Sequence, residues 1–498
     1  MAKFEFVNVD RPGDEKKHST KIRRHVMKDI GKSRRKPKRR GETTIARGVL
    51  LDGESSSRDA GPHQQALVPS PLIDGRINGI VFPTEMDEER LNLARFLFVE
   101  ARNSYHPFRF PWLSIGLSDS AAWYITLANA VLFKTMKPDE TVKPEFSTNT
   151  EAMKWYTLSL ESISKRLSDP KERSKEGLII AISGFICHDS STGNFTRQDI
   201  HLRGLKQLVD DRGGIDEITN PLLRLMISWH DLSGASYRNS APYFDVPKGA
   251  ITEIDTRNDT EYFQRLLNSW NEQCPYLGDI LGALRATAAV ASYINRHCHA
   301  PKFWTDDVLA ARLLAPALHE ILSLEGRALP SDPSVPNYSG IAAREAFRRS
   351  SLIFLVSVKV KFGAVSFELA RHLNDFRQIS QIPHVKWALV PELNLWAHTI
   401  AALQDKSSLR VGHVSAISSI MKTMGLTSGH QALEIVRSII WVEALFADQV
   451  ESLCQDIDSF MASDTAYQLS KSSVDLPLAE IIEGLDDVSL AQPSFEAF

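Results

Sequence analysis

Hydrophobic side chains recur at helical spacing along most of this chain, most clearly between residues 199 and 235. The first half of that stretch carries apolar residues at i, i+3 and i+7, which form one face of a helix. These residues are Leu202, Leu205 and Val209. Gly213 and Gly214 then provide positive-φ positions, on which helices commonly end. Asn220 as N-cap and Pro221 at the first helical position begin a second helix, so the stretch predicts a helical hairpin.

Similar apolar periodicity continues along the body of the chain and predicts further helices. They lie near residues 119–136, 149–168, 174–190, 197–212, 221–239, 260–273, 279–298, 305–325, 340–373, 389–405, 411–424, 428–446 and 448–463. No comparable run alternates with period two. The predicted fold class is therefore all-α, with one large multi-helix domain over residues 81–465.

Three segments of this domain give more specific expectations. Residues 84–87 resemble a capping box, with Asp in place of the usual Glu, and predict a helix that continues to about residue 103. Residues 105–112 contain Pro107 and Pro111, so we expect a loop whose aromatic side chains fill the core. Residues 341–363 predict a central helix that is uncharged in its middle and carries its charges near the ends.

The cysteine pattern and the N-terminus bear on the compartment. The four cysteines lie far apart and form no CxxC pair, which favours a reducing intracellular environment over a disulfide scaffold. The first ten residues lack the apolar core of a signal peptide. The longest weakly charged stretch, residues 113–133, contains Asp119 and small polar residues, so it predicts a buried helix. We expect an intracellular protein without membrane association.

Charge is distributed unevenly along the chain. Residues 1–47 contain 16 Lys and Arg against 6 Asp and Glu, whereas residues 48–498 contain 42 against 55. This composition predicts a disordered basic arm over residues 1–47, followed by a Gly-, Ser- and Pro-containing linker over residues 48–80. A basic arm on an acidic body indicates an anionic partner for the arm.

The densest part of the arm, residues 34–40 (RRKPKRR), is typical of a nuclear import signal. The same cations can neutralise DNA phosphates, and a short helix near residues 20–30 would add cations from its polar side. Import without DNA contact is the alternative that the sequence leaves open. The residues assigned to import or DNA contact are Arg23, Arg24, Lys28, Lys32, Arg34, Arg35, Lys36, Lys38, Arg39 and Arg40.

The C-terminal residues 466–498 form a tail of the opposite character. No Lys or Arg follows Lys471, and six acidic residues are interleaved with apolar ones. Such interleaving is typical of activation segments, in which the acids keep apolar side chains exposed to a partner's groove. The alternative is a C-terminal helix that docks on the domain and frays at its end.

The sequence contains no pattern that identifies a metal or catalytic site. It has no GxSxG, Walker, HExxH or GxGxxG motif. The neighbours His297, Cys298 and His299 would point to different sides of a helix, which argues against one tetrahedral metal site. For the same reason, the run from Cys187 to Asp189 cannot form a catalytic relay. We therefore predict no catalytic residue, no metal and no cofactor.

The hairpin between residues 199 and 235 resembles the core of the fungal-specific transcription factor domain, a helical regulatory region that usually follows a binuclear zinc cluster. The resemblance is carried by His201-x-x-Gly204-Leu205, Leu208-Val209, Arg212-Gly213-Gly214-Ile215, Ile227-x-Trp229-x-Asp231 and Gly234-Ala235. It is looser over about residues 80–465 and includes the start of the predicted central helix, Glu345-Ala346-x-Arg348. The resemblance implies structural roles for its signature residues. These are His201, Gly204, Leu205, Arg212, Gly213, Gly214, Trp229 and Asp231.

A binuclear cluster needs six closely spaced cysteines, and the first 180 residues contain none. The opening of the chain instead resembles family members that lack the cluster. The matching segments are Phe4-Glu5-Phe6-Val7-Asn8 and Ile22-Arg23-Arg24-His25-Val26-Met27.

Together these resemblances imply a nuclear transcription regulator with an all-α regulatory domain. The expected partners are DNA, contacted weakly through the arm, an import receptor and transcriptional co-regulators. The resemblance also implies a homodimer, although the sequence has no coiled-coil heptad run. The alternatives are an accessory regulator that acts by protein contact alone and a helical enzyme of secondary metabolism.

Overall fold

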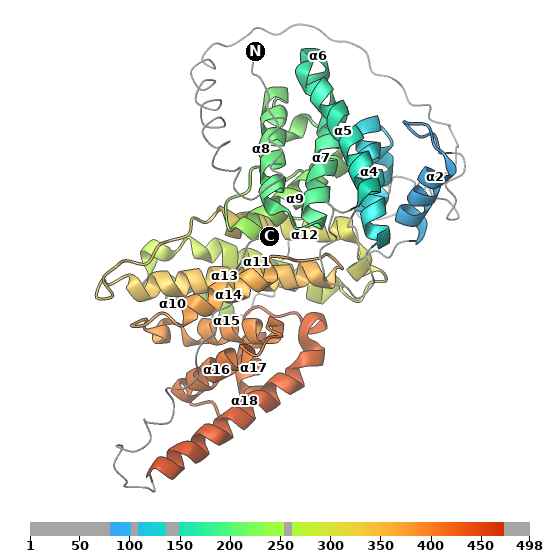
Figure 1. Cartoon of the computed structure of the whole chain (residues 1–498). Coiled ribbons are helices and arrows are strands. Elements are labelled where there is room, and N and C mark those ends of the chain that lie inside the picture. The colour runs from blue at the N-terminus through green and yellow to red at the C-terminus, as the bar shows by residue number, and fades with distance from the viewer. Residues whose placement is uncertain (1–79, 101–107, 136–148, 253–260, 473–498) are drawn as a thin grey trace, which may run out of the picture. The chain divides into compact units, whose positions relative to one another are not determined.

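The computed structural model of the chain describes residues 80–100, 108–135, 149–252 and 261–472. These residues form helices joined by turns and loops, and no strand occurs among them, which confirms the predicted all-α fold class (Figure 1). No helix of this described part is long and apolar enough to cross a membrane. The predicted arm, most of the linker and most of the acidic tail lie outside the described residues.

The first helices differ from the sequence prediction. Helix α2 (Glu88–Arg95) begins after Asp87, whose side chain accepts a hydrogen bond from the backbone N–H of Arg90, so the N-cap predicted at residue 84 is wrong. A π-helical turn, η2 (Phe96–Glu100), follows. Residues 109–112 belong to α3 (Arg109–Gly116) and are not a loop. Pro111 is tolerated because it lies in the first helical turn, where a backbone N–H has no intrahelical acceptor.

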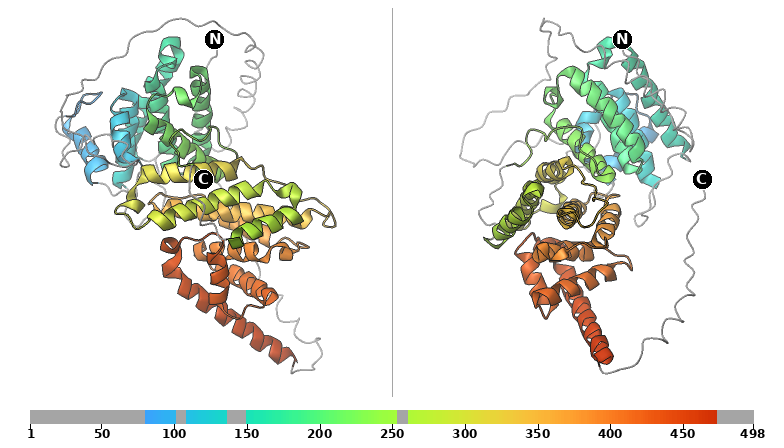
Figure 2. Two further views of the ribbon diagram at one scale, coloured as in Figure 1. Left: turned by 180° about the vertical axis from the view of Figure 1, so that it is seen from behind. Right: turned by 90° about the vertical axis from the view of Figure 1, so that its left-hand side faces the viewer.

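The next helices form one layer. Helix α4 packs against α5 and α7, and α7 packs against α8, so these helices run alongside one another in the views of Figures 1 and 2. Their bounds are α4 (Ser120–Thr135), α5 (Thr150–Ser168), α6 (Pro170–Arg173), α7 (Glu176–Ser191), α8 (Phe195–Arg212) and α9 (Pro221–Arg238), with the 3₁₀ turn η5 (Ile215–Glu217) between α8 and α9. The core of this layer includes Trp123, Trp155 and Phe185, each no more than 1% exposed.

The second layer runs across the first and is centred on the longest buried helix, α13 (Figure 1). Its elements are α10 (Glu261–Gln273), η6 (Pro275–Leu277), α11 (Ile280–His297), η7 (Phe303–Thr305), α12 (Asp307–Ser323), α13 (Tyr338–Lys361) and α14 (Leu369–Ser380). The single helix predicted over residues 340–373 is divided in two. The chain turns at Gly363, where φ is +89°, a conformation that glycine adopts without steric cost.

The last layer packs on α13 through α15. It contains η8 (Trp387–Leu389), α15 (Pro391–Gln404), α16 (Arg410–Met424), α17 (Gly429–Arg437) and α18 (Glu443–Ser472). The break predicted near residue 447 is wrong, because α17 ends at Arg437 and α18 begins at Glu443. Between them, the buried Ile440 carbonyl accepts a hydrogen bond from Trp396 Nε1 at 2.9 Å, so a tertiary contact fixes this turn.

Candidate functional site

The described residues include the signature residues of the hairpin but not the residues assigned to DNA contact and import. The candidates for DNA contact and import, Arg23 to Arg40, lie outside the described ranges. The signature residues from His201 to Asp231 lie on the helices α8 and α9, except for Gly213 and Gly214, which lie in the turn after α8 (Figure 1). The local geometry of this hairpin is as predicted. Gly213 and Gly214 have φ values of +116° and +114°, and the Asn220 side chain caps α9 by accepting from the N–H groups of the next turn.

A buried carboxylate holds the first signature histidine. Asp189, on α7, is fully buried and lies 2.7 Å through Oδ2 from His201 Nδ1. Its other oxygen, Oδ1, accepts a hydrogen bond from Arg197 Nε at 2.5 Å. The side chain of Asp189 therefore joins the C-terminal part of α7 to two successive turns of α8 and fixes the orientation of the imidazole.

Arg212 makes a second connection between these helices, at the other end of α8. Its guanidinium donates to the carbonyl oxygens of Ser174, at 2.8 Å, and Glu217, at 3.1 Å, and lies 3.3 Å from the carboxylate of Glu176. Glu176 also accepts hydrogen bonds from the backbone N–H groups of Thr219 and Asn220. The arginine thus links the start of α7 to the turn of the hairpin.

Asp231 holds the chain segment that follows α9, and Gly234 allows α9 to pack closely on α8. Asp231 Oδ2 accepts hydrogen bonds from the backbone N–H groups of Tyr243, at 2.7 Å, and Phe244, at 2.9 Å. Burial raises the pKa of Asp231 to about 7, although these hydrogen bonds oppose the shift. A Cβ at Gly234 would lie 2.5 Å from Gln198 Oε1, so this glycine permits the close approach of α8 and α9. At Gly204, in contrast, a Cβ would meet nothing within 4 Å.

Trp229 joins α9 to the central helix α13. The Lys359 ammonium of α13 lies 5.4 Å from the centre of the Trp229 ring, within the range of a cation–π contact. Lys359 is 4% exposed and lies 2.7 Å from the carboxylate of Glu368, which is 2% exposed. It also donates to the hydroxyl of Ser233 at 3.0 Å. A buried ion pair therefore lies directly beneath the signature tryptophan.

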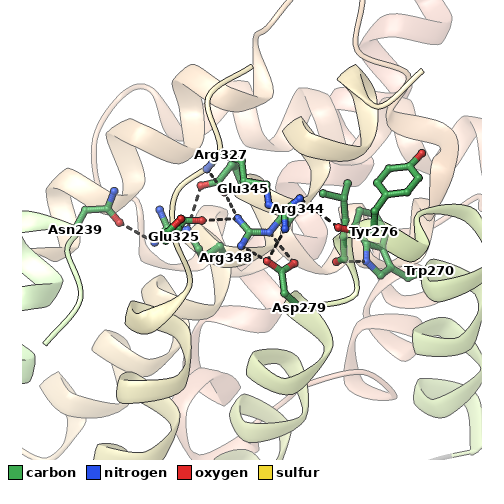
Figure 3. Close-up of polar contacts among 10 residues, drawn as sticks. Asn239, Trp270, Tyr276, Asp279, Glu325, Arg327, Arg344, Glu345 and Arg348 are labelled. Carbon is green, nitrogen blue, oxygen red and sulfur yellow. Dashed lines mark hydrogen bonds and ion pairs between the residues drawn. The ribbon is translucent and has the colours of Figure 1, made fainter. Parts of the chain in front are cut away.

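A larger network of charges surrounds the N-terminal half of α13 (Figure 3). Arg344 is fully buried and makes a bidentate pair with Asp279, with nitrogen–oxygen distances of 3.0 and 2.6 Å. It also donates to the carbonyl of Glu325 at 3.1 Å and pairs with Glu345. Burial alone would raise the pKa of Asp279, but the hydrogen bonds and the positive charge of Arg344, together with Arg327, hold it below its ordinary value.

The same network reaches α9. Glu345 accepts from Arg348 Nε at 3.1 Å and from the backbone N–H of Arg327 at 3.1 Å. Arg348 Nη1 then donates to the side-chain oxygen of Asn239 at 2.8 Å. Asn239 is the C-cap of α9 and has a left-handed backbone, with φ of +54°. The network therefore connects the end of the signature hairpin to α13 and to the start of α11.

The run from Cys187 to Asp189 has no relay geometry. Burial raises the pKa of the Cys187 thiol to about 12, whereas a nucleophilic thiol needs a lowered pKa. His188 Nδ1 lies 2.7 Å from the side-chain oxygen of Asn129, and burial lowers the pKa of His188 to about 3. Asp189 instead faces His201, as described above. Within the described ranges, no group of three or more His, Cys, Asp or Glu side chains is arranged to hold a metal ion.

The buried ionic pairs of α13 were not predicted from the sequence. Glu345 and Arg348 are three residues apart, a spacing that predicts a contact on one helix face. Asp279 is 65 residues from Arg344, and no local pattern indicates that the two meet. Lys359 and Glu368 lie on either side of the turn at Gly363, which the predicted continuous helix did not contain.

The comparison with protein families gives one match. The family of the fungal specific transcription factor domain matches residues 92–438, more than half of the chain, and the match includes the signature hairpin and α13. No match was found among the curated proteins or among the solved structures. The family consists of transcription regulators, and its match agrees with the resemblance seen in the hairpin. The chain belongs to the fungal-specific transcription factor domain family.

Proposed function

We propose that this chain is a nuclear transcription regulator that contacts DNA weakly, through its basic arm, while the helical domain selects partners. The observation that carries the proposal is the combination of two features in one chain. The family of the regulatory domain matches residues 92–438, and residues 16–40 hold 13 Lys and Arg with a single acid, Asp29.

The physical argument for the arm is electrostatic. Lys and Arg side chains neutralise phosphates and release condensed counterions, which gives affinity for DNA with little reading of sequence. The rest of the chain has an excess of acids, 55 against 42 basic residues, and DNA repels such a body. Several basic side chains of this acidic body cannot contact DNA, because Arg344, Arg348 and Lys359 are buried in ion pairs with carboxylates. The arm is therefore the favoured contact.

Promoter choice then rests on protein partners. Contacts with phosphates alone position a protein without specifying a base sequence. In our proposal, co-regulators bind the acidic–hydrophobic tail over residues 466–498, and a homodimer brings two arms to neighbouring sites. The basic cluster at residues 34–40 binds the import receptor before the protein reaches DNA.

The DNA contact is tested by fluorescence anisotropy of a labelled duplex titrated with the full-length protein over a range of salt concentrations. The arm variant replaces six cations by glutamine. These are Arg34, Arg35, Lys36, Lys38, Arg39 and Arg40. If each of them contacts one phosphate, the slope of log affinity against log salt becomes shallower by about 5, because each contact contributes about 0.9.

A matched control removes the same charge from the surface of the domain. It replaces Lys165, Lys171, Arg285, Lys302, Lys386 and Lys406, all exposed, by glutamine. We expect this control to keep the salt slope of the wild type. Equal losses in the two variants would show that net charge, and not the arm, determines binding. No binding of the wild type at low salt would favour the accessory regulator that acts by protein contact alone.

Import is tested separately by imaging the full-length protein and the arm variant in fungal cells. We expect the wild type in the nucleus and the arm variant in the cytosol. A nuclear arm variant would assign import to another segment, and it would leave the DNA measurement unaffected.

A further inference from the structure

A pocket of about 220 Å³ lies between α14, α15 and α16, away from the signature hairpin and the α13 network. Its walls are mostly apolar, and Leu409 and Val411 at its edge are 51% and 59% exposed. Two imidazoles, His398 and His413, also line it, although they are only 5% and 1% exposed. The volume is below the roughly 300 Å³ at which sites for drug-sized ligands begin, so a ligand has to be compact.

The contacts of the two histidines favour one ring nitrogen as the available acceptor. Their Nδ1 atoms lie 3.5 Å apart, and two bare lone pairs would repel at that separation, so one ring carries its proton on Nδ1. His413 Nε2 lies 3.7 Å from a carboxylate oxygen of Asp405, which favours the proton on that nitrogen. We therefore assign the proton of His398 to Nδ1, which leaves the lone pair on its Nε2 as an acceptor. No hydrogen bond to His398 Nε2 occurs within the described part of the chain.

The pocket also offers little to a charged ligand. Arg377, on its wall, lies 3.1 Å from the carboxylate of Asp405, so its charge is already balanced. Burial lowers the pKa of His398 to about 3 and that of His413 to about 4, so both rings are neutral at cellular pH. The remaining polar groups, Ser380 and Gln381, are neutral as well.

We propose that this pocket binds a compact, uncharged organic molecule with an apolar body and one hydroxyl group, of which phenol is the simplest example. The hydroxyl donates to His398 Nε2, and the apolar body packs against Leu409, Val411 and the Ala416 side chain. The pocket is lined by residues between 377 and 416, whereas the proposed DNA contact uses residues 16–40, so either proposal can fail without the other. It would give the regulatory domain a means of responding to a small hydroxylated molecule.

The proposal is tested by calorimetric titration of the full-length protein with three probes of similar size: phenol, toluene and benzoate. We expect phenol to bind roughly tenfold more tightly than toluene, which is the contribution of one hydrogen bond to a buried acceptor. Benzoate should bind more weakly than phenol because the pocket has no unbalanced cation. Benzoate binding more tightly than phenol, or no phenol binding at millimolar concentration, would overturn the proposal.

Two variants and one matched control locate the binding. Gly412 lines the pocket, and a Cβ there would meet nothing within 4 Å, so Gly412→Leu adds bulk at the pocket without a clash at Cβ and should weaken phenol binding. Gly204→Leu makes the same change on a distant helix that also has open space at Cβ, and it should leave binding unchanged. His398→Phe should reduce the preference for phenol over toluene to about one. Retention of that preference in His398→Phe, or equal losses in the two leucine variants, would contradict the proposed site.

Discussion

The charge network of α13 gives the sharpest test of how the domain is held together. We expect Arg344→Met to destabilise the domain, because it removes the bidentate pair with Asp279, the bond to the Glu325 carbonyl and the contact with Glu345. Methionine has a similar apolar stem, so the substitution tests the guanidinium and not the packing of the side chain.

The expected magnitude follows from the exposure of each partner. Breaking a buried ion pair by removing one member costs about 3–5 kcal/mol, because the other charge is left uncompensated. Asp279 is 33% exposed at its side chain and regains water, whereas Glu345 is 10% exposed and keeps Arg348. The expected loss of unfolding free energy is therefore at the lower end of this range, about 3 kcal/mol. Arg344→Lys keeps the charge but cannot make the bidentate pair, so its stability should lie between those of the wild type and Arg344→Met.

The assay is urea unfolding followed by circular dichroism at pH 7, with the midpoint compared at an unchanged slope. Arg327→Met is the control, because Arg327 contacts the same Asp279 with a side chain that is 39% exposed, and surface pairs contribute about 1 kcal/mol or less. If the free energy of unfolding of Arg344→Met is within about 1 kcal/mol of that of the wild type, the network does not stabilise the domain as described.

Three further predictions concern stability and use the same unfolding assay. Lys359→Met should lower the free energy of unfolding by about 3–5 kcal/mol, because it leaves Glu368 buried and unpaired. The double variant with Glu368→Leu should recover most of this loss. An equally unstable double variant would contradict the prediction. Asn220→Ala removes the N-cap of α9 and should cost about 1 kcal/mol, whereas no change would show that the cap is dispensable. His398 has a pKa of about 3 in the folded protein and takes up a proton near pH 6.5 when unfolded. Its contribution to the free energy of unfolding is therefore complete above pH 6.5 and is lost as the pH falls toward 3. Between pH 7.5 and 5.5 the wild type should therefore lose about 1 kcal/mol more unfolding free energy than His398→Phe. Parallel pH profiles would refute the assignment. Asp231, with its raised pKa, acts in the opposite sense in both proteins.

Local sequence patterns predict most of the helices because burial of one apolar face gives a period of 3.6 residues. The cap at Asn220 and the turn at Gly213–Gly214 follow from side-chain chemistry within a few residues, and the structure confirms both. The division at Gly363 was missed, because apolar residues continue on both sides and only tertiary packing places the turn there. The break between α17 and α18 was misplaced for a similar reason, since the bond from Trp396 to the Ile440 carbonyl joins distant segments.

The candidate residues were predictable to very different degrees. The hairpin signature identified the family, which the match over residues 92–438 confirms. The pocket beside His398 was not predictable, because it needs three helices whose relative positions are set by long-range packing. The basic arm was identified by composition alone, and its role stays a prediction because Arg23 to Arg40 lie outside the described residues.

Genome-wide chromatin occupancy with and without residues 16–40 shows whether the arm brings this regulator to DNA. Both proteins should carry the same added import signal, so that nuclear entry does not differ between them. We expect occupancy to fall to background across the bound sites when the 13 cations of this segment are removed. Unchanged occupancy at the same sites would contradict this expectation, and would show that partner proteins alone bring this chain to chromatin.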